Sequence, residues 1–198
     1  VARHGIRNDF ALKVLIRKLA ESVKQPLSYS RMASIVSSTG KKMSTDTAID
    51  YVRYMDESWL LLPFENYVGK LQDKEMNRKY YFIDNGLLAL FLLDPATSLL
   101  ENIVAVNLRR KYGDECYFFN APKHEVDFYI PAESTGIQVA YSIADRDTRK
   151  READALLALA DYQHVQHLQI VTKDEEETLE ENGKVISVIP LWKWMMNL

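Results

Sequence analysis

Residues 125–142 read EVDFYIPAESTGIQVAYS, and this stretch decides how the second half of the chain folds. Two runs rich in β-branched and aromatic residues, 125–131 and 136–142, flank a turn-forming segment, which predicts two neighbouring strands. Asp127 lies in the first run and Gln138 in the second. A spacing of eleven positions across a turn suits adjacent strands, so these two side chains are expected to lie at one site.

The segments around this stretch predict an α/β layer. A helix is expected over 94–113, between Asp94-Pro95 and Gly113, and a strand over 115–121. A second helix follows over 145–162. Further strands are expected over 165–172 and 184–190, a short helix over 191–198, and a solvated helix or loop over the acidic run 173–184. The order αβββαβ is the core order of the restriction-endonuclease-like fold.

A metal-dependent nuclease site is the chemistry expected at this place in such a fold. Glu101, in the helix 94–113, can reach Asp127 and Gln138. Carboxylates hold Mg²⁺, and the metal polarises a phosphodiester and activates a bound water. Glu101, Asp127 and Gln138 are therefore the candidate catalytic residues, and Glu101 and Asp127 the candidate metal ligands.

The position that needs a lysine in such a site holds Ala140. A methyl group can neither orient a water nor stabilise developing charge. A substitute cation is conceivable from the start of the next helix, at Arg146, Arg149 or Lys150. The sequence thus predicts a degenerate nuclease-like site, with an active Mg²⁺-dependent nuclease as the alternative.

The first half predicts three helices followed by a two-stranded hairpin. Helical spacing covers 9–23 with Asp9 as N-cap, a short helix from Ser28 or Ser30 through Val36 ending at Gly40, and 44–60 with Ser44 as N-cap. The third helix has its expected apolar stripe at Ala48, Tyr51, Val52, Met55 and Trp59. Strands are expected over 60–67 and 79–85, separated by a polar stretch. This is the order of a winged helix-turn-helix.

A winged helix can place its third helix in the major groove of DNA and its wing on phosphates. The candidate nucleic-acid contacts are the cations Lys41, Lys42, Arg53, Lys70, Lys74, Arg78 and Lys79. Acidic residues on the third helix would repel phosphate, so packing or protein contact by this unit is the competing interpretation.

Composition supports two units, expected over 1–90 and 94–198. Residues 1–93 carry 14 Lys+Arg and 10 Asp+Glu, whereas residues 94–198 carry 11 and 18, so a basic half precedes an acidic one. Hydrophobic residues make up 47% of the 198 residues, enough for a buried core. A single cysteine and no long apolar run predict a cytoplasmic location without membrane insertion.

The segment VARHGIRN with the three expected helices after it, and then KYYFIDNGL, LLENIVAVNLRRKYG, EVDFYI, IQVAYSI and TRKREADALLAL, together resemble the C-terminal half of a prokaryotic family of AAA-type ATPases. Members of that family carry a P-loop ATPase domain, a winged helix and a restriction-endonuclease-like domain of unknown function. The resemblance implies that Glu101, Asp127 and Gln138 form the nuclease-like constellation. It also implies ATP and Mg²⁺ binding by an N-terminal domain outside this chain. The chain itself contains no G-x-x-x-x-G-K-[ST] loop.

The resulting expectation is a C-terminal fragment of an ATPase that is not itself an enzyme and needs no cofactor. Its expected partner is double-stranded DNA, or else a protein such as the parent ATPase domain. A protein-binding module without DNA binding is the third alternative.

Overall fold

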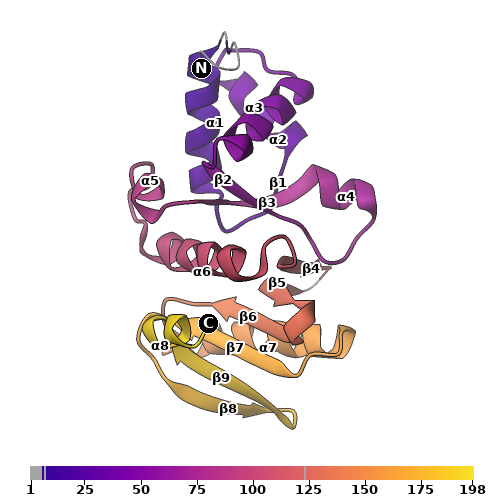
Figure 1. Cartoon of the computed structure of the whole chain (residues 1–198), viewed down its shortest axis with the longest axis vertical. Helices are drawn as coiled ribbons and strands as arrows, with labels where there is room; N and C mark the ends of the chain where they lie inside the picture. Colours follow the sequence, from indigo (N-terminus) through magenta and orange to yellow (C-terminus); the bar gives the residue numbers. More distant parts are fainter. Residues whose placement is uncertain (1–5, 7, 123) are drawn as a thin grey trace.

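The computed structural model describes residue 6 and residues 8–122 and 124–198. Three helices lie at one end of the molecule, α6 crosses the middle, and a six-stranded sheet lies at the other end (Figure 1). A smaller three-stranded sheet separates the helices from α6. The fold is therefore α+β with two sheets, as the sequence predicts.

The three N-terminal helices are α1 (Asp9–Glu21), α2 (Tyr29–Ser38) and α3 (Thr45–Glu57). The side chains of Ser28 and Ser44 accept hydrogen bonds from Arg31 N and Thr47 N, which confirms both as N-caps. The cap of α1 is Asn8 rather than Asp9, because the Asn8 side chain accepts from Ala11 N at 3.0 Å. Gly40 follows α2 with φ +88°, a left-handed conformation that glycine adopts without steric cost.

The apolar stripe of α3 is buried at its first four expected positions and exposed at the last. Ala48, Tyr51, Val52 and Met55 face the core, whereas Trp59 is 74% exposed. The helix ends at Glu57, and Trp59 turns away with φ +58°. The 3.6-residue spacing therefore no longer determines where the Trp59 side chain points.

The small sheet has the order β1-β3-β2. β2 (Leu61–Phe64) pairs antiparallel with β3 (Asn77–Phe82), and β1 (Leu27–Ser28) pairs with the start of β3. The expected hairpin strands thus pair with each other. The connection between them contains a short helix, α4 (Leu71–Met76), where the sequence suggested only a polar stretch. A further helix, α5 (Asn85–Ala89), leads to α6.

The second half begins with α6 (Ala96–Tyr112), followed by β4 (Tyr117–Ala121), β5 (His124–Ile130), a 3-10 turn (Pro131–Glu133) and β6 (Thr135–Val139). Then come α7 (Arg146–Tyr162), β7 (His167–Thr172), β8 (Glu177–Glu181), β9 (Lys184–Pro190) and α8 (Leu191–Met196). The order in the sheet is β4-β5-β6-β7-β9-β8. β4, β5 and β6 are antiparallel neighbours, while β6, β7 and β9 run parallel.

The acidic run 173–184 corrects one expectation, because it contains the strand β8 instead of a solvated helix or loop. β8 pairs antiparallel with β9 at the edge of the sheet. Its Leu179 is buried while most of its glutamates are exposed. An edge strand with one buried side chain and charged neighbours keeps its free edge soluble. The acidic composition of this run therefore does not indicate the strand, which depends on pairing with β9.

One apolar core joins the two halves of the chain. Buried residues from α1–α3, the small sheet, α6 and β4–β6 form a single contiguous cluster, and a second cluster lies around α7. The rings of Phe64 in β2 and Tyr81 in β3 pack against the ring of Phe128 in β5, with centroids 5.6 and 5.5 Å from that of Phe128. In addition, both the amide and the carbonyl of Phe82 bond to the Asn102 side chain. β3 is therefore packed into the second half. Among the described helices, none has the length and apolar character needed to cross a bilayer.

Candidate functional site

A cleft of about 710 Å³ opens beside the large sheet, and it contains all three candidate catalytic residues. Glu101 reaches it from the first turns of α6, Asp127 from β5 and Gln138 from β6. Further lining side chains come from Lys18 near the end of α1, from Lys24 in the segment that follows α1, and from α7. The sequence therefore identified residues from three separate elements that do converge at one place.

Asp127 and Gln138 connect β5 to β6 where the backbone pairing stops. The paired register ends at Phe128 and Ile137, and beyond it side chains take over. Gln138 Oε1 accepts a hydrogen bond from Asp127 N at 2.8 Å, and Asp127 Oδ2 accepts one from Val139 N at 3.0 Å. The Gln138 amide group also donates to Glu125 O and to Glu152 Oε2. Gln138 therefore acts here as a connector between strands and α7.

Lys79 lies at the centre of the acidic residues, which corrects its expected role as a contact to DNA phosphates. Its side chain is completely buried. The Nζ atom lies 2.7 Å from Glu125 Oε1, 3.1 Å from Asp127 Oδ1 and 3.6 Å from Glu101 Oε1. We call Lys79, Glu101, Glu125 and Asp127 the acid–lysine cluster. The Lys79 side chain extends from β3 of the small sheet toward these acids. Because it has no exposed surface, no phosphate can reach it.

The charge of Lys79 is stabilised by its surroundings. Burial alone lowers the pKa of the Lys79 ammonium, but attraction to Asp127, Glu101 and Glu125 outweighs burial and raises that pKa above its ordinary value. The ammonium therefore stays charged at any physiological pH. It is the positive group next to the strand acids that the sequence lacks at position 140.

Glu101 is buried and only partly satisfied. Its Oε1 accepts a hydrogen bond from the Tyr81 hydroxyl at 2.8 Å, while no donor among the described residues reaches its Oε2. Burial and the nearby charge of Asp127 raise the pKa of Glu101 to about 7, against the opposing attraction of Lys79. A carboxyl group in this state is protonated in a substantial fraction of molecules near neutral pH.

Ala140 is 6% exposed and belongs to the apolar cluster around α7. The three cations considered as its substitutes do not fill the role. Arg149 pairs with Glu177 and Lys150 with Asp154, while Arg146 is exposed at the start of α7. Position 140 therefore offers no charge to the cleft, and the cation bonded to Asp127 is Lys79 of β3.

Three acidic residues of the cleft, Glu21, Glu125 and Glu152, were not identified from the sequence. Glu125 bonds to Lys79, and Glu152 of α7 is 6% exposed and bonded to Gln138 and Arg151. A signal for Glu152 exists, because Leu156 and Leu159 follow it at helical spacing on the buried face of α7. A charged residue on such a buried face marks a polar site.

The donor set does not fit a resident divalent ion as it stands. Within residues 8–122 and 124–198, no group of three or more His, Cys, Asp or Glu side chains is arranged to hold a metal. Glu101 and Asp127 both face the Lys79 ammonium, which occupies the space between these two candidate ligands.

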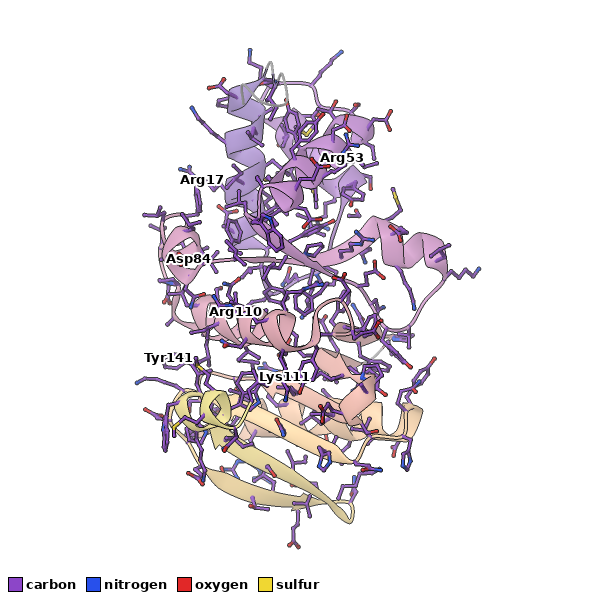
Figure 2. All side chains as sticks on the ribbon, viewed as in Figure 1. Arg17, Arg53, Asp84, Arg110, Lys111 and Tyr141 are labelled. Atoms are coloured by element: carbon purple, nitrogen blue, oxygen red, sulfur yellow. The ribbon has the colours of Figure 1, made fainter. Side chains whose placement is uncertain are left out.

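The other predicted nucleic-acid contacts fall into two groups. Lys41, Lys42 and Lys70 are exposed, and Lys74 is half-buried with its Nζ 5.9 Å from the Tyr67 ring centroid. Arg78 is 18% exposed and bonds to Glu65 and Glu75. Arg53 lies on α3, in the three-helix part of the molecule (Figure 2), and bonds to Asp50. Acidic neighbours thus neutralise both arginines.

The chain is similar to one domain of unknown function and to two proteins described as uncharacterized. Residues 2–98 match the model of a domain of unknown function, DUF8612, and the matched region ends in the first turn of α6. An uncharacterized protein of Methanocaldococcus jannaschii is 26% identical over 206 residues, covering 99% of this chain and 46% of that protein. An uncharacterized protein of Haemophilus influenzae is 28% identical over 194 residues, covering 94% and 47%. The chain therefore spans about half the length of these curated relatives.

Proposed function

We propose that this chain is the C-terminal region of a AAA-type ATPase, built from a winged helix and a restriction-endonuclease-like unit, and that it binds without cutting. The observation that carries the proposal is the acid–lysine cluster. Glu101, Asp127 and Gln138 converge as a nuclease site would require, but Ala140 is packed in an apolar environment and Lys79 lies between the two candidate metal ligands. The relatives are about twice as long as the shared region, which is compatible with a further domain in them.

The ligand that we propose first is double-stranded DNA, contacted through the exposed lysines Lys41, Lys42 and Lys70. Lys41 and Lys42 lie in the turn between α2 and α3, where a helix-turn-helix approaches the duplex. The test is fluorescence anisotropy with a labelled duplex at several salt concentrations. Binding that weakens steeply with salt, and weakens further in Lys41→Ala/Lys42→Ala, supports the proposal. An absence of binding at low salt removes DNA as the ligand.

One observation favours a protein partner instead. On α3, the Arg53 guanidinium is bonded to Asp50 and lies 4.0 Å from Glu57, so the surface of the third helix carries little free positive charge. A recognition helix needs such charge on its exposed face. If the duplex does not bind, immobilised ATPase domain of the same parent is the partner to test next.

Another observation favours an active nuclease. Lys79 brings an ammonium to the strand acids, and the buried Oε2 of Glu101 has no hydrogen-bond donor among the described residues. Incubation with DNA and RNA in Mg²⁺ or Mn²⁺ tests this alternative. Cleavage that disappears in Asp127→Ala would establish a nuclease and refute the binding-only proposal.

A further inference from the structure

We infer that the buried Lys79 ammonium is the cation bound by Glu101, Glu125 and Asp127, excludes divalent metal from these acids, and has turned a metal-type acid site into a joint that holds β3 against α6 and β5. This inference rests on the proposed function, because it explains what the retained acids do in a region that does not cut. It concerns the acid–lysine cluster defined above.

The geometry of Lys79 is that of a cation bound by carboxylates. The two shorter contacts, to Glu125 and Asp127, are charge-assisted hydrogen bonds, and the third carboxylate, Glu101, lies slightly farther away. An ammonium has three donors, and the three carboxylates surround it from two elements, α6 and β5. The side chains that would supply oxygen ligands to Mg²⁺ are therefore already used by a cation of the chain itself.

The ammonium cannot simply move aside for a metal. Lys79 has no exposed surface, and its Nζ lies 5.7 Å from the centroid of the Phe118 ring. The neighbouring residues Tyr80, Tyr81 and Phe82 are buried in the same core. A divalent ion beside the ammonium would meet like charge, and a divalent ion in its place would leave a buried charge without a partner. Both states are less favourable than the one observed.

The same acids fasten β3 to the second half of the chain. Glu101 accepts a hydrogen bond from the Tyr81 hydroxyl. The side chain of Asn102, the next residue of α6, forms hydrogen bonds with the backbone amide and carbonyl of Phe82. Together with the contacts of Lys79, polar contacts thus hold β3 at three positions, 79, 81 and 82. The acid residues have a structural use in the chain that requires no metal and no substrate.

The experiment is a Mn²⁺ titration of the full chain followed by electron paramagnetic resonance, which counts free and bound ion directly. Wild type is expected to show no saturable site below about 1 mM. Lys79→Met, which keeps much of the stem and removes the charge, is expected to gain one site. Adding Asp127→Asn to that variant is expected to weaken the new site by about 10–100-fold. The matched control is Lys24→Met, an exposed lysine on the same cleft, which is expected to gain no site.

A saturable Mn²⁺ site in wild type that is lost in Asp127→Asn would overturn the inference. A new site that appears equally in Lys24→Met would overturn it too, since any loss of charge would then suffice. Should Lys79→Met fail to fold, the wild-type titration and its Asp127→Asn partner still decide the question.

A parallel cleavage assay separates this inference from the proposed function. Metal binding in wild type without cleavage refutes the inference and leaves the binding-only function standing. Metal-dependent cleavage by wild type refutes the proposed binding-only function. No metal binding and no cleavage in wild type, together with a metal site in Lys79→Met, is the result that supports both.

Discussion

The surface of α3 and the acid–lysine cluster both pair a cation with carboxylates, yet the two regions have different consequences. Arg53 is 57% exposed and its partner Asp50 is 49% exposed, so water and salt screen their attraction. Lys79 is fully buried with Glu101, and its charge depends on its protein partners. The same chemistry is therefore a minor surface feature in one region and a structural requirement in the other. The predictions below test this contrast.

Removal of the Lys79 charge should have the largest effect. Lys79→Met leaves Glu101, Glu125 and Asp127 together without a cation, and breaking a buried ion pair from one side costs about 3–5 kcal/mol. Urea unfolding followed by circular dichroism measures the loss. If the unfolding free energy decreases by less than about 1 kcal/mol, the cluster contributes little to stability.

The pH dependence of stability should reveal the buried carboxyl of Glu101. Burial and the charge of Asp127 raise the pKa of Glu101 from 4.5 to about 7, so the folded state binds a proton more tightly than the unfolded chain. Its contribution to stability is therefore complete below about pH 4.5 and is lost as the pH rises through about 7. Relative to Glu101→Gln, wild type should lose up to about 3 kcal/mol between pH 4.5 and pH 8.

The measurement for this prediction is urea unfolding of both proteins across that pH range. Only the difference between the two curves is informative, because other groups titrate in both proteins. Parallel curves would mean that Glu101 has an ordinary pKa.

Asn102 should matter next. Its side chain accepts a hydrogen bond from the backbone amide of Phe82 and donates one to the carbonyl of the same residue, and both bonds are buried. Asn102→Ala leaves these buried groups unpaired and should cost about 2–3 kcal/mol in unfolding free energy. Asn107→Ala is the matched control on the same helix. Among the described residues, the Asn107 side chain bonds to the Ile103 carbonyl one turn earlier and to no other group, so its loss should cost under about 1 kcal/mol. Equal effects of the two changes would contradict the role of Asn102.

The smallest effect is expected at Arg53. Its contacts to Asp50 and Glu57 are exposed helix pairs, which contribute about 0.3–0.5 kcal/mol each. Arg53→Ala should therefore change the thermal midpoint by no more than a few degrees, and the change should shrink further in 0.5 M salt. A loss comparable to that of Lys79→Met would mean that exposure does not separate the two regions.

Local patterns predicted much of the fold and part of the site. The caps Ser28 and Ser44 follow from short-range signals at the starts of their helices. The strands of the large sheet other than β8 follow from apolar runs between turn residues. The convergence of Glu101, Asp127 and Gln138 follows from spacing within 125–142 and around it. These features depend on neighbours in the sequence or on one turn between strands. For that reason a single sequence suffices to predict them.

The burial of Lys79 cannot be predicted from residue spacing, because it depends on tertiary packing. A lysine next to three aromatic residues in KYYF is compatible with a wing that faces DNA and with a strand whose charged side chain is buried. The packing of the small sheet against α6 and β5 decides between these, and it brings together residues 48 positions apart. A long-range contact of this kind supplies the cation that Ala140 lacks. The strand β8 was missed for a related reason, since its pairing with β9 outweighs its acidic composition.

The most direct test of the account is a double-mutant cycle between Lys79 and Asp127, with Lys79→Met, Asp127→Asn and the combined variant compared by urea unfolding. The Nζ–Oδ1 separation of 3.1 Å in a buried environment predicts a coupling energy of about 2–3 kcal/mol, with the combined variant more stable than the sum of the single effects implies. A coupling energy near zero would show that the two charges do not interact in solution and would contradict the acid–lysine cluster as described.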